Sequence, residues 1–446
     1  MLQRVNVGRW SLEAYDGIAP AAILQELRGL AGELAGARIL HVNATPYGGG
    51  VSELLRSSVP LLRDLGLTVD WEVMGGSPDF FSATKALHNA LQGSPRSLTE
   101  AEQAAYLECV RENAESLAGA YDFIVVHDPQ PAGLLSAHGH GSAHWVWRCH
   151  IDTSEPNAEA WRFMRPYLEG YDAAVFTMPE FVPPDFPVAR VETIAPAIDP
   201  LSPKNLDLDL ATASQILDWI GVDLPGRLVT QVSRFDAWKD PLGVIDAYRL
   251  VREEIGALQL ALVGSMALDD PEGWEVYRQV SEAAGQDPLI HLYTNLSGVG
   301  NVEVNAFQRL SEVVVQKSIR EGFGLVVSES LWKGTPVVAG RAGGIPMQMP
   351  EGTGGRLVAS TEQCATAMLE LLKDHELAVE LGRRGRERVR EHFLLPRLLR
   401  DELRLLASLS ASGAPPLAGR GWRGRGCPPF MGSRSVVIRR ILGRRG

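Results

Sequence analysis

The fold is decided by a stretch in the second half of the chain that reads VVVQKSIREGFGLVVSESLW, residues 313–332. Residues 313–315 are apolar and β-branched, which is typical of a strand buried in a sheet. A loop with two glycines follows, and an apolar helical pattern begins at Gly324. Because neighbouring parallel strands are usually connected through a helix, this strand–loop–helix unit predicts a parallel β-sheet.

The same alternation of short apolar runs and longer amphipathic segments extends over most of the chain. Helical periodicity is clear in residues 51–65 and 241–254, for example. Strands that are apolar on both faces and are separated by helices predict a sheet covered on both sides, the α/β class. The predicted strands are residues 37–42, 67–74, 123–126, 144–148, 173–176, 227–232, 258–263, 289–293, 313–316 and 336–339.

A proline-rich segment interrupts this alternation. Residues 179–203 contain seven prolines, a density typical of a linker or a domain boundary. We therefore predict two doubly wound, Rossmann-like domains, residues 1–200 and 201–395, followed by a helix at 396–410 and a tail at 411–446. Ligands of such sheets bind beyond the carboxyl ends of the strands, so two facing sheets predict a cleft between the domains.

Charge is distributed unevenly along the 446 residues. The 43 Lys and Arg residues and 54 Asp and Glu residues give a net charge of −11, which disfavours a nucleic-acid partner, because such binding requires phosphate neutralisation. Residues 411–446 hold eight of the arginines and no Lys, Asp or Glu, so the rest of the chain is more acidic still. The many glycines and prolines of this tail predict disorder.

The sequence shows no sign of export or of a membrane span. No apolar stretch resembles a secretory signal or a transmembrane helix. The four cysteines lie far apart and form no CxxC pair, which predicts neither a disulfide framework nor a zinc site. We therefore expect a cytoplasmic protein without a membrane partner.

Three consecutive glycines, Gly48, Gly49 and Gly50, follow the first predicted strand and directly precede a helix. Glycines at this position let the backbone approach a ligand closely, and the amino terminus of the helix favours an anion. A tight turn that needs positive φ values accounts for the same residues.

In the second half, Arg234 and Lys239 lie in the turn between a predicted strand and a helix that begins at Pro241. A forked guanidinium and a compact ammonium group suit a diphosphate. Surface ion pairs with Asp236 or Asp240 are the alternative.

Two glutamates, Glu321 and Glu329, stand with seven residues between them in the stretch quoted above. Glu321 falls in the loop and Glu329 in the helix, so they lie at different depths. A carboxylate accepts hydrogen bonds from both hydroxyls of a vicinal diol, so the pair predicts contacts to different parts of one ligand. The alternative is a solvated Glu321 and a Glu329 that interacts with the helix dipole.

Polar residues follow two predicted strands of the first half: Asp128 after 123–126, and His150 and Asp152 after 144–148. Together at one sheet edge they predict a wall that binds sugar, whereas each alone is equally explained by a structural role.

A second group of histidines, His138, His140 and His144, lies among glycines, which favours a loop over a metal site. No acidic motif typical of a diphosphate-bound metal stands out at a strand end. We therefore predict no metal.

These motifs together resemble the retaining glycosyltransferases of family GT4, which have the GT-B fold, over residues 37–395. The family's E-x7-E signature matches Glu321 and Glu329, with Gly322, Phe323 and Gly324 between them. By this resemblance, Glu321 holds the hydroxyls of the donor sugar and Glu329 the ribose of the nucleotide.

The resemblance also implies roles for the other motifs. The donor diphosphate contacts Arg234 and Lys239, the glycine run forms a donor-side loop, and His150 lies near the anomeric carbon. The implied catalytic residues are His150, Arg234, Lys239 and Glu321. The implied donor-binding residues are Gly48, Gly49, Gly50, Arg234, Lys239, Glu321, Gly322, Phe323, Gly324, Leu325 and Glu329. The implied acceptor-binding residues are Asp128 and Asp152.

Within that family, residues 41–43 with 48–51, residues 147–152 and residues 316–324 are most similar to the members that form trehalose. Those enzymes transfer glucose reversibly from an NDP-glucose to free glucose and give α,α-trehalose. The resemblance thus implies UDP-, ADP- or GDP-glucose as donor, free glucose as acceptor, and no cofactor. The resemblance does not determine the nucleotide base or the oligomeric state, for which a homodimer is one possibility. The tail at 411–446 has no counterpart in the family.

Three alternatives stay open. A transferase that uses a sugar-phosphate acceptor would need a basic cluster on the wall of the first domain, where Arg148 is the obvious candidate. A non-catalytic protein that binds nucleotide sugars is disfavoured by the presence of the whole set of implied catalytic residues, Glu321, Arg234, Lys239 and His150. A transferase acting on membrane glycans usually has a basic amphipathic docking helix, which the first half lacks.

Overall fold

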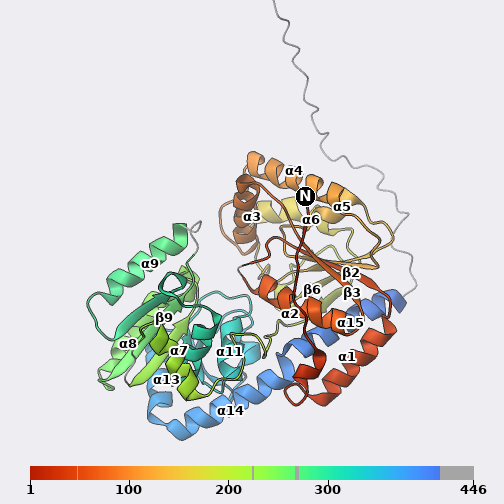
Figure 1. Ribbon diagram of the computed structural model, residues 1–446. Helices are drawn as coiled ribbons and strands as arrows, with labels where there is room; N and C mark the ends of the chain where they lie inside the picture. The colour runs from red at the N-terminus through yellow and green to blue at the C-terminus, as the bar shows by residue number, and fades with distance from the viewer. Residues whose placement is uncertain (48, 223–225, 267–270, 412–446) are drawn as a thin grey trace, which may run out of the picture.

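The computed structural model describes residues 1–47, 49–222, 226–266 and 271–411 (Figure 1). The predictions made for Gly48 and for the tail beyond residue 411 lie outside the described residues.

The first half of the chain forms a seven-stranded sheet with the order β1-β3-β2-β4-β5-β6-β7. The short β1 is antiparallel to β3, and the other pairs are parallel. The strands are β1 (Gln3–Arg4), β2 (Arg38–Asn43), β3 (Thr68–Val73), β4 (Phe123–His127), β5 (His144–Arg148), β6 (Ala173–Phe176) and β7 (Val191–Thr193).

Helices cover both faces of this sheet, because alternate residues of each strand are apolar and point to opposite sides. One face packs against α1 (Ala21–Glu33), α2 (Gly50–Asp64) and α15 (Leu395–Ala411). The other face packs against α3 (Pro78–Leu91), α4 (Glu100–Ser116), α5 (Leu134–His138) and α6 (Ala158–Leu168).

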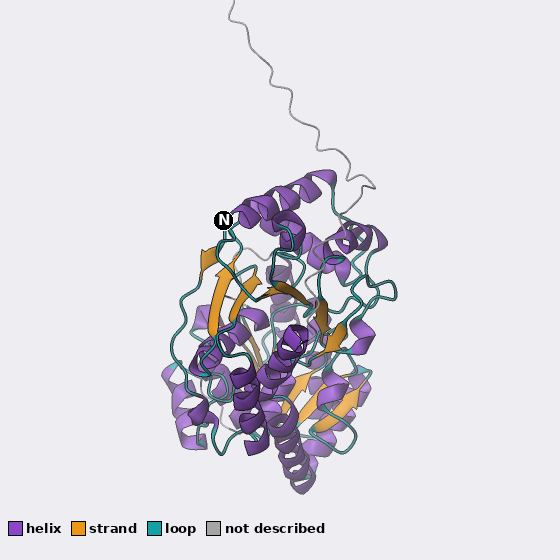
Figure 2. Ribbon diagram, turned by 90° about the vertical axis from the view of Figure 1, so that its right-hand side faces the viewer, coloured by secondary structure: helices purple, strands orange, loops and turns teal. Residues whose placement is uncertain are grey.

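The second half forms a six-stranded parallel sheet with the order β10-β9-β8-β11-β12-β13. Figure 2 shows the strands of both sheets enclosed by helices. The strands are β8 (Arg227–Val232), β9 (Leu258–Gly264), β10 (Ile290–Thr294), β11 (Val313–Gln316), β12 (Val337–Gly340) and β13 (Gly355–Val358).

The helices of the second half also lie on both faces of its sheet. One face is covered by α8 (Pro241–Arg252), α9 (Pro271–Ala284) and α13 (Thr361–Lys373). The remaining helices are α7 (Leu210–Trp219), α10 (Asn301–Leu310), α11 (Leu325–Trp332), α12 (Ile345–Gln348) and α14 (His375–His392). Short 3₁₀ helices span Leu12–Tyr15, Pro179–Phe181, Ala237–Lys239 and Asn295–Ser297. Two sheets that are parallel, apart from the short β1, and are covered on both sides confirm the predicted α/β fold class.

Two chain segments pass between the halves side by side. The first follows β7, and the second connects α14 to α15, which returns to the first half and packs against α1 and α2 (Figure 1). The segments are joined by a parallel bridge between Ile198 and Leu394.

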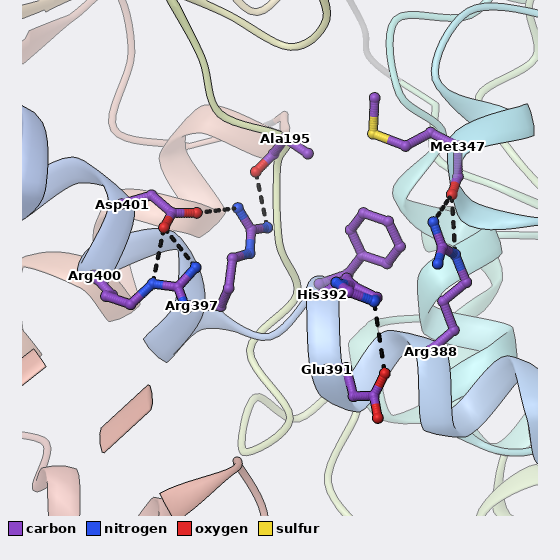
Figure 3. A pocket seen from close by; sticks show the side chains of 9 residues that line it. Ala195, Met347, Arg388, Glu391, His392, Arg397, Arg400 and Asp401 are labelled. Atoms are coloured by element: carbon purple, nitrogen blue, oxygen red, sulfur yellow. Dashed lines mark hydrogen bonds and ion pairs between the residues drawn. The ribbon is translucent and has the colours of Figure 1, made fainter. Parts of the chain in front are cut away.

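A pocket of about 470 Å³ opens at this junction (Figure 3). Its arginines already have protein partners: Arg397 donates to the carbonyl of Ala195, and Arg388 donates to the carbonyl of Met347. None of the residues that line it belongs to the predicted site, so we treat the pocket as part of the joint between the halves.

In the described part of the chain, no helix is both long enough and apolar enough to cross a membrane. Cys109, Cys149 and Cys364 are free and buried, as expected for thiols that pack as small apolar groups.

Candidate active site

The carboxyl ends of the two sheets meet through the loops that carry the predicted site. A Cβ atom added to Gly322, after β11, would lie 3.2 Å from the carbonyl oxygen of His150, after β5. A Cβ atom added to Gly50 would lie 3.2 Å from Cδ1 of Leu325. Glycine at these two positions therefore allows the loops of the two halves to approach each other closely.

The same contact places two helix amino termini next to each other. Helix α2 begins at Gly50 and α11 begins at Leu325, and each is preceded by a glycine with positive φ, 101° at Gly49 and 80° at Gly324. A glycine N-cap has no side chain to accept hydrogen bonds from the first turn. In α11 the N–H of Val327 donates to the carbonyl of Gly324, but the N–H groups that precede it have no side-chain cap, as in α2. Two such termini favour an anion between them.

Lys239 and Glu321 form an ion pair beside these termini. The Nζ atom of Lys239 is 2.6 Å from Oε2 of Glu321, and both side chains are largely buried. Gln316 and Ser318 also donate to Oε2, at 3.4 and 3.2 Å. All three donors reach the same oxygen, so Oε1 of Glu321 has no hydrogen-bond partner among the described residues.

Arg234 lies outside this cluster. Its side chain is 71% exposed, and its ion-pair partner is Asp236 at 3.7 Å, the surface pair that the sequence left as an alternative. Its charge, together with the larger effect of burial, lowers the pKa of His88 to about 4. His88 belongs to α3 in the first half, so Arg234 faces α3 from the opposite half.

Glu329 is buried in α11 and faces the chain segment that joins the halves. Its Oε1 atom is 3.6 Å from Nζ of Lys204, which also contacts Oε2 of Glu53 in α2 at 2.9 Å. Burial lowers the pKa of Lys204, but the two carboxylates outweigh it and raise the pKa above its ordinary value. Lys204, which the sequence analysis missed, thus connects both halves to the predicted ribose-binding residue.

On the wall of the first half, Asp128 holds the backbone of His150. The Oδ1 atom of Asp128 accepts the N–H of His150 at 2.8 Å, and Asp128 has a left-handed φ of 66°. Burial raises the pKa of Asp128 to about 7, against the opposing effects of that N–H and the charge of Arg148.

Asp152 lies between a turn of its own half and an arginine of the other half. Its Oδ1 atom accepts the backbone N–H and the hydroxyl of Ser154. Its Oδ2 atom is 3.9 Å from the guanidinium of Arg320, which lies 5.3 Å from the ring centroid of Trp238. Arg320 is a second residue between the halves that the sequence analysis missed.

The raised pKa of Asp128 predicts a pH-dependent stability. An unfolded Asp has a pKa of about 3.9, so the folded chain binds this proton more tightly and loses stability as pH rises from about 4 through 7. Asp128→Asn keeps the acceptor for His150 but cannot ionise. The quantity to measure, by circular dichroism, is the melting temperature of Asp128→Asn minus that of the wild type. We expect this difference to be several degrees larger at pH 8 than at pH 5. Asp218→Asn, at an exposed position of α7, is the control; an equal difference for Asp128→Asn at both pH values would contradict the prediction.

The second group of histidines does not converge on one point. His140 and His144 face Asp172 at 3.1 and 3.8 Å, whereas His138 contacts the carbonyl of Ala114. The described residues contain no group of three or more His, Cys, Asp or Glu side chains that could hold a metal ion.

Comparison with known proteins places the chain in a family. The family model "Trehalose synthase, N-terminal domain" matches residues 41–183, and "Glycosyl transferases group 1" matches residues 220–388. The trehalose synthase of Rubrobacter xylanophilus is 54% identical over 92% of this chain and 99% of its own length. The trehalose synthase of Pyrococcus horikoshii is 44% identical over 92% of this chain and 99% of its own length.

Solved structures confirm the two-domain GT-B architecture. Sucrose-phosphate synthase from Thermosynechococcus elongatus superimposes with a TM-score of 0.67 over 84% of this chain and all of that chain, at 18% sequence identity. At that identity the likeness concerns the fold alone. Taken with the match to trehalose synthases over nearly the whole of their length, it shows that the chain belongs to the trehalose synthase family of GT-B glycosyltransferases.

Proposed function

We propose that this glycosyltransferase moves glucose from an NDP-glucose to free glucose and forms α,α-trehalose, reversibly. The observation that carries the proposal is the pair of adjacent helix amino termini, α2 and α11, beside the Lys239–Glu321 ion pair. This arrangement combines an anion site with a carboxylate suited to sugar hydroxyls, which are the two chemical features of a nucleotide sugar.

In the proposed donor complex, the diphosphate lies between the two helix termini. Lys239 turns from Glu321 to the phosphate oxygens, and Arg234, exposed in the ligand-free chain, closes on the same group. Glu321 then accepts hydrogen bonds from the glucosyl hydroxyls, and Glu329 accepts them from the ribose. Gly49, Gly50 and the backbone of residues 322–325 let the ligand approach the main chain. Lys239 and Glu321, which would hold different parts of the donor, thus neutralise each other in its absence.

The proposed reaction breaks the bond between the anomeric carbon and the diphosphate oxygen. Lys239, Arg234 and the helix N–H groups stabilise the negative charge that develops on the leaving group. A hydroxyl of the acceptor glucose forms the new carbon–oxygen bond on the same face, and its proton passes to the leaving phosphate. Closure of the two halves over the donor excludes water and suppresses hydrolysis. No cofactor or metal is part of this proposal.

Free glucose is favoured over a sugar phosphate as acceptor by the position of Arg148. Sequence reasoning left this residue as the candidate phosphate ligand on the wall of the first half. Its side chain is buried, and it lies on the sheet face covered by α15 rather than in the cleft. The proposed acceptor site is formed by His150, Asp128 and Asp152.

The test is an incubation with UDP-, ADP- or GDP-glucose and a panel of acceptors: glucose, glucose 6-phosphate and fructose 6-phosphate. We expect trehalose, identified by the NMR signals of its α,α-linkage, with free glucose and at least one donor, and no phosphorylated disaccharide. A product only with the sugar phosphates, or release of the nucleoside diphosphate without a disaccharide, would refute the proposal.

A further inference from the structure

Three histidines from adjacent strands form a continuous row that ends in the cleft. His41 lies in β2, His127 ends β4, and His150 follows β5. The Nδ1 atom of His41 is 3.0 Å from Nε2 of His127, and Nδ1 of His127 is 3.0 Å from Nε2 of His150. His41 and His127 are each only 1% exposed, whereas His150 is half-buried at the edge of the sheet.

The row has only two proton arrangements. Burial lowers the pKa of all three histidines, so each imidazole is neutral and carries one N–H and one lone pair. Each of the two nitrogen–nitrogen contacts holds one proton. In the first arrangement the protons point toward the cleft and His150 presents an N–H on Nδ1. In the second they point away from the cleft and Nδ1 of His150 carries a lone pair.

The inner end of the row distinguishes these arrangements. Nε2 of His41 and Oε1 of Glu402 are both buried without a hydrogen-bond partner among the described residues. Glu402 belongs to α15, which covers the sheet face on which His41 and His127 lie, and its charge raises the pKa of His41 against the larger effect of burial. An N–H on Nε2 that points toward this carboxylate is stabilised by its charge, and one ordered water between them would satisfy both atoms. A lone pair there would face the negative charge of Glu402, so the electrostatic interaction favours the N–H.

Arg148 lies on the same face and acts in the opposite direction. Its positive charge lowers the pKa of His41, but by less than Glu402 raises it. The Nε and Nη1 atoms of Arg148 also lack partners among the described residues, and its electrostatic partners are Glu402, Asp128 and Asp401. The carboxylate of Glu402 therefore decides which of the two proton arrangements the three histidines adopt.

We propose that Glu402, His41 and His127 are positioning residues that fix the proton of His150 on Nε2 and leave Nδ1 as a hydrogen-bond acceptor for a substrate hydroxyl. Nδ1 of His150 has no hydrogen-bond partner among the described residues. His127 contacts Nε2 of the ring, and Asp128 accepts the backbone N–H of His150, so both the ring and the main chain of His150 are held. The inference rests on the proposed function for the identity of the substrate, but not for the position of the proton.

Nitrogen NMR tests the proton position independently of activity. In protein labelled with [¹⁵N]histidine, the two-bond proton–nitrogen correlations distinguish the tautomers of an imidazole, and a His150→Asn variant identifies the signals of His150. We expect the Nε2–H form of His150 in the wild type and a predominantly Nδ1–H form in Glu402→Gln. The Nδ1–H form in the wild type, or no change in Glu402→Gln, would overturn the proposal.

Kinetics test whether the tautomer matters to the reaction. We expect Glu402→Gln to lower kcat about 10-fold, a change typical of a perturbed group that assists proton transfer or hydrogen bonding, with the KM for the donor within about two-fold. His127→Phe, which keeps an aromatic ring but breaks the row, should have the same effect. Glu391→Gln in α14 is the matched control and should leave kcat unchanged. An unaltered kcat in folded Glu402→Gln and His127→Phe would refute the positioning role. If the wild type makes no trehalose, the proposed function fails, while the NMR result still decides the proton position.

Discussion

Lys239→Ala is expected to lower kcat for glucosyl transfer about 100- to 1,000-fold, the usual loss when one group that stabilises transition-state charge is removed. In the ligand-free chain Lys239 pairs with Glu321, and in the proposed donor complex it contacts the diphosphate. The charge on the leaving group grows as its bond to the anomeric carbon breaks, so the loss falls on kcat more than on the KM for the acceptor. Steady-state rates of nucleoside diphosphate release with glucose as acceptor measure it.

Removal of Lys239 also leaves the buried carboxylate of Glu321 without its cation, so loss of activity must be separated from loss of folding. The melting temperature and the far-ultraviolet circular dichroism of the variant provide that separation. Lys373→Ala is the matched control, because Lys373 is exposed and pairs with Glu254, away from the cleft. Wild-type kcat in a folded Lys239→Ala variant would remove Lys239 from the phosphate site.

The strands could be predicted well because their cause is local. β5, β6, β8 and β11 have the bounds that the sequence predicts, since both faces of these strands are buried and apolar, β-branched or aromatic residues predominate in them. β7 was missed: it is three residues long, partly exposed and enclosed by prolines. α3 was missed although its signal was present, a Ser77 N-cap followed by Pro78 and apolar residues at helical spacing.

The pairing of α15 with α1 and α2 could not be predicted by the same reasoning. Apolar residues at helical spacing show that α15 has a face to bury, but the pattern does not say which surface receives it. That choice depends on the return of the chain to the first half, a contact between residues far apart in the sequence.

The residues of the candidate site likewise fall into those that the sequence could predict and those that it could not. Lys239 and Glu321 could be predicted from the sequence because each follows a strand of one parallel sheet. In the structure they form an ion pair. His88, Lys204 and Arg320 could not be predicted from the sequence, because their contacts depend on how the two halves face each other. The row of histidines depends on the order of β2, β4 and β5 in the sheet, which no spacing along the chain reveals.

Gly343→Ala is expected to lower kcat/KM at least about 100-fold, because a displacement of about 1 Å at the reacting groups is enough for such a loss. A Cβ atom on Gly343 would lie 1.7 Å from the carbonyl oxygen of Glu321, far inside van der Waals contact. The neighbouring Gly344 donates its N–H to the carbonyl of Gly322 at 3.0 Å, so the loop before α12 and the Glu321 loop are packed backbone to backbone. The added methyl group must push the Glu321 loop out of position.

Two effects of Gly343→Ala must be distinguished, the displaced loop and the cost of a left-handed alanine. Gly343 has a φ of 50°, and Gly334, at the end of α11, has a φ of 81° with open space where its Cβ would lie. Gly334→Ala therefore carries the backbone strain, about 1–2 kcal/mol, without the collision. We expect both variants to lose thermal stability, but only Gly343→Ala to lose kcat/KM, measured at a temperature well below either melting point. Equal kcat/KM values in the two variants would contradict the prediction. They would show that displacing the backbone carbonyl of Glu321 does not affect catalysis, and that the packing of Gly343 against this loop does not position the Glu321 carboxylate.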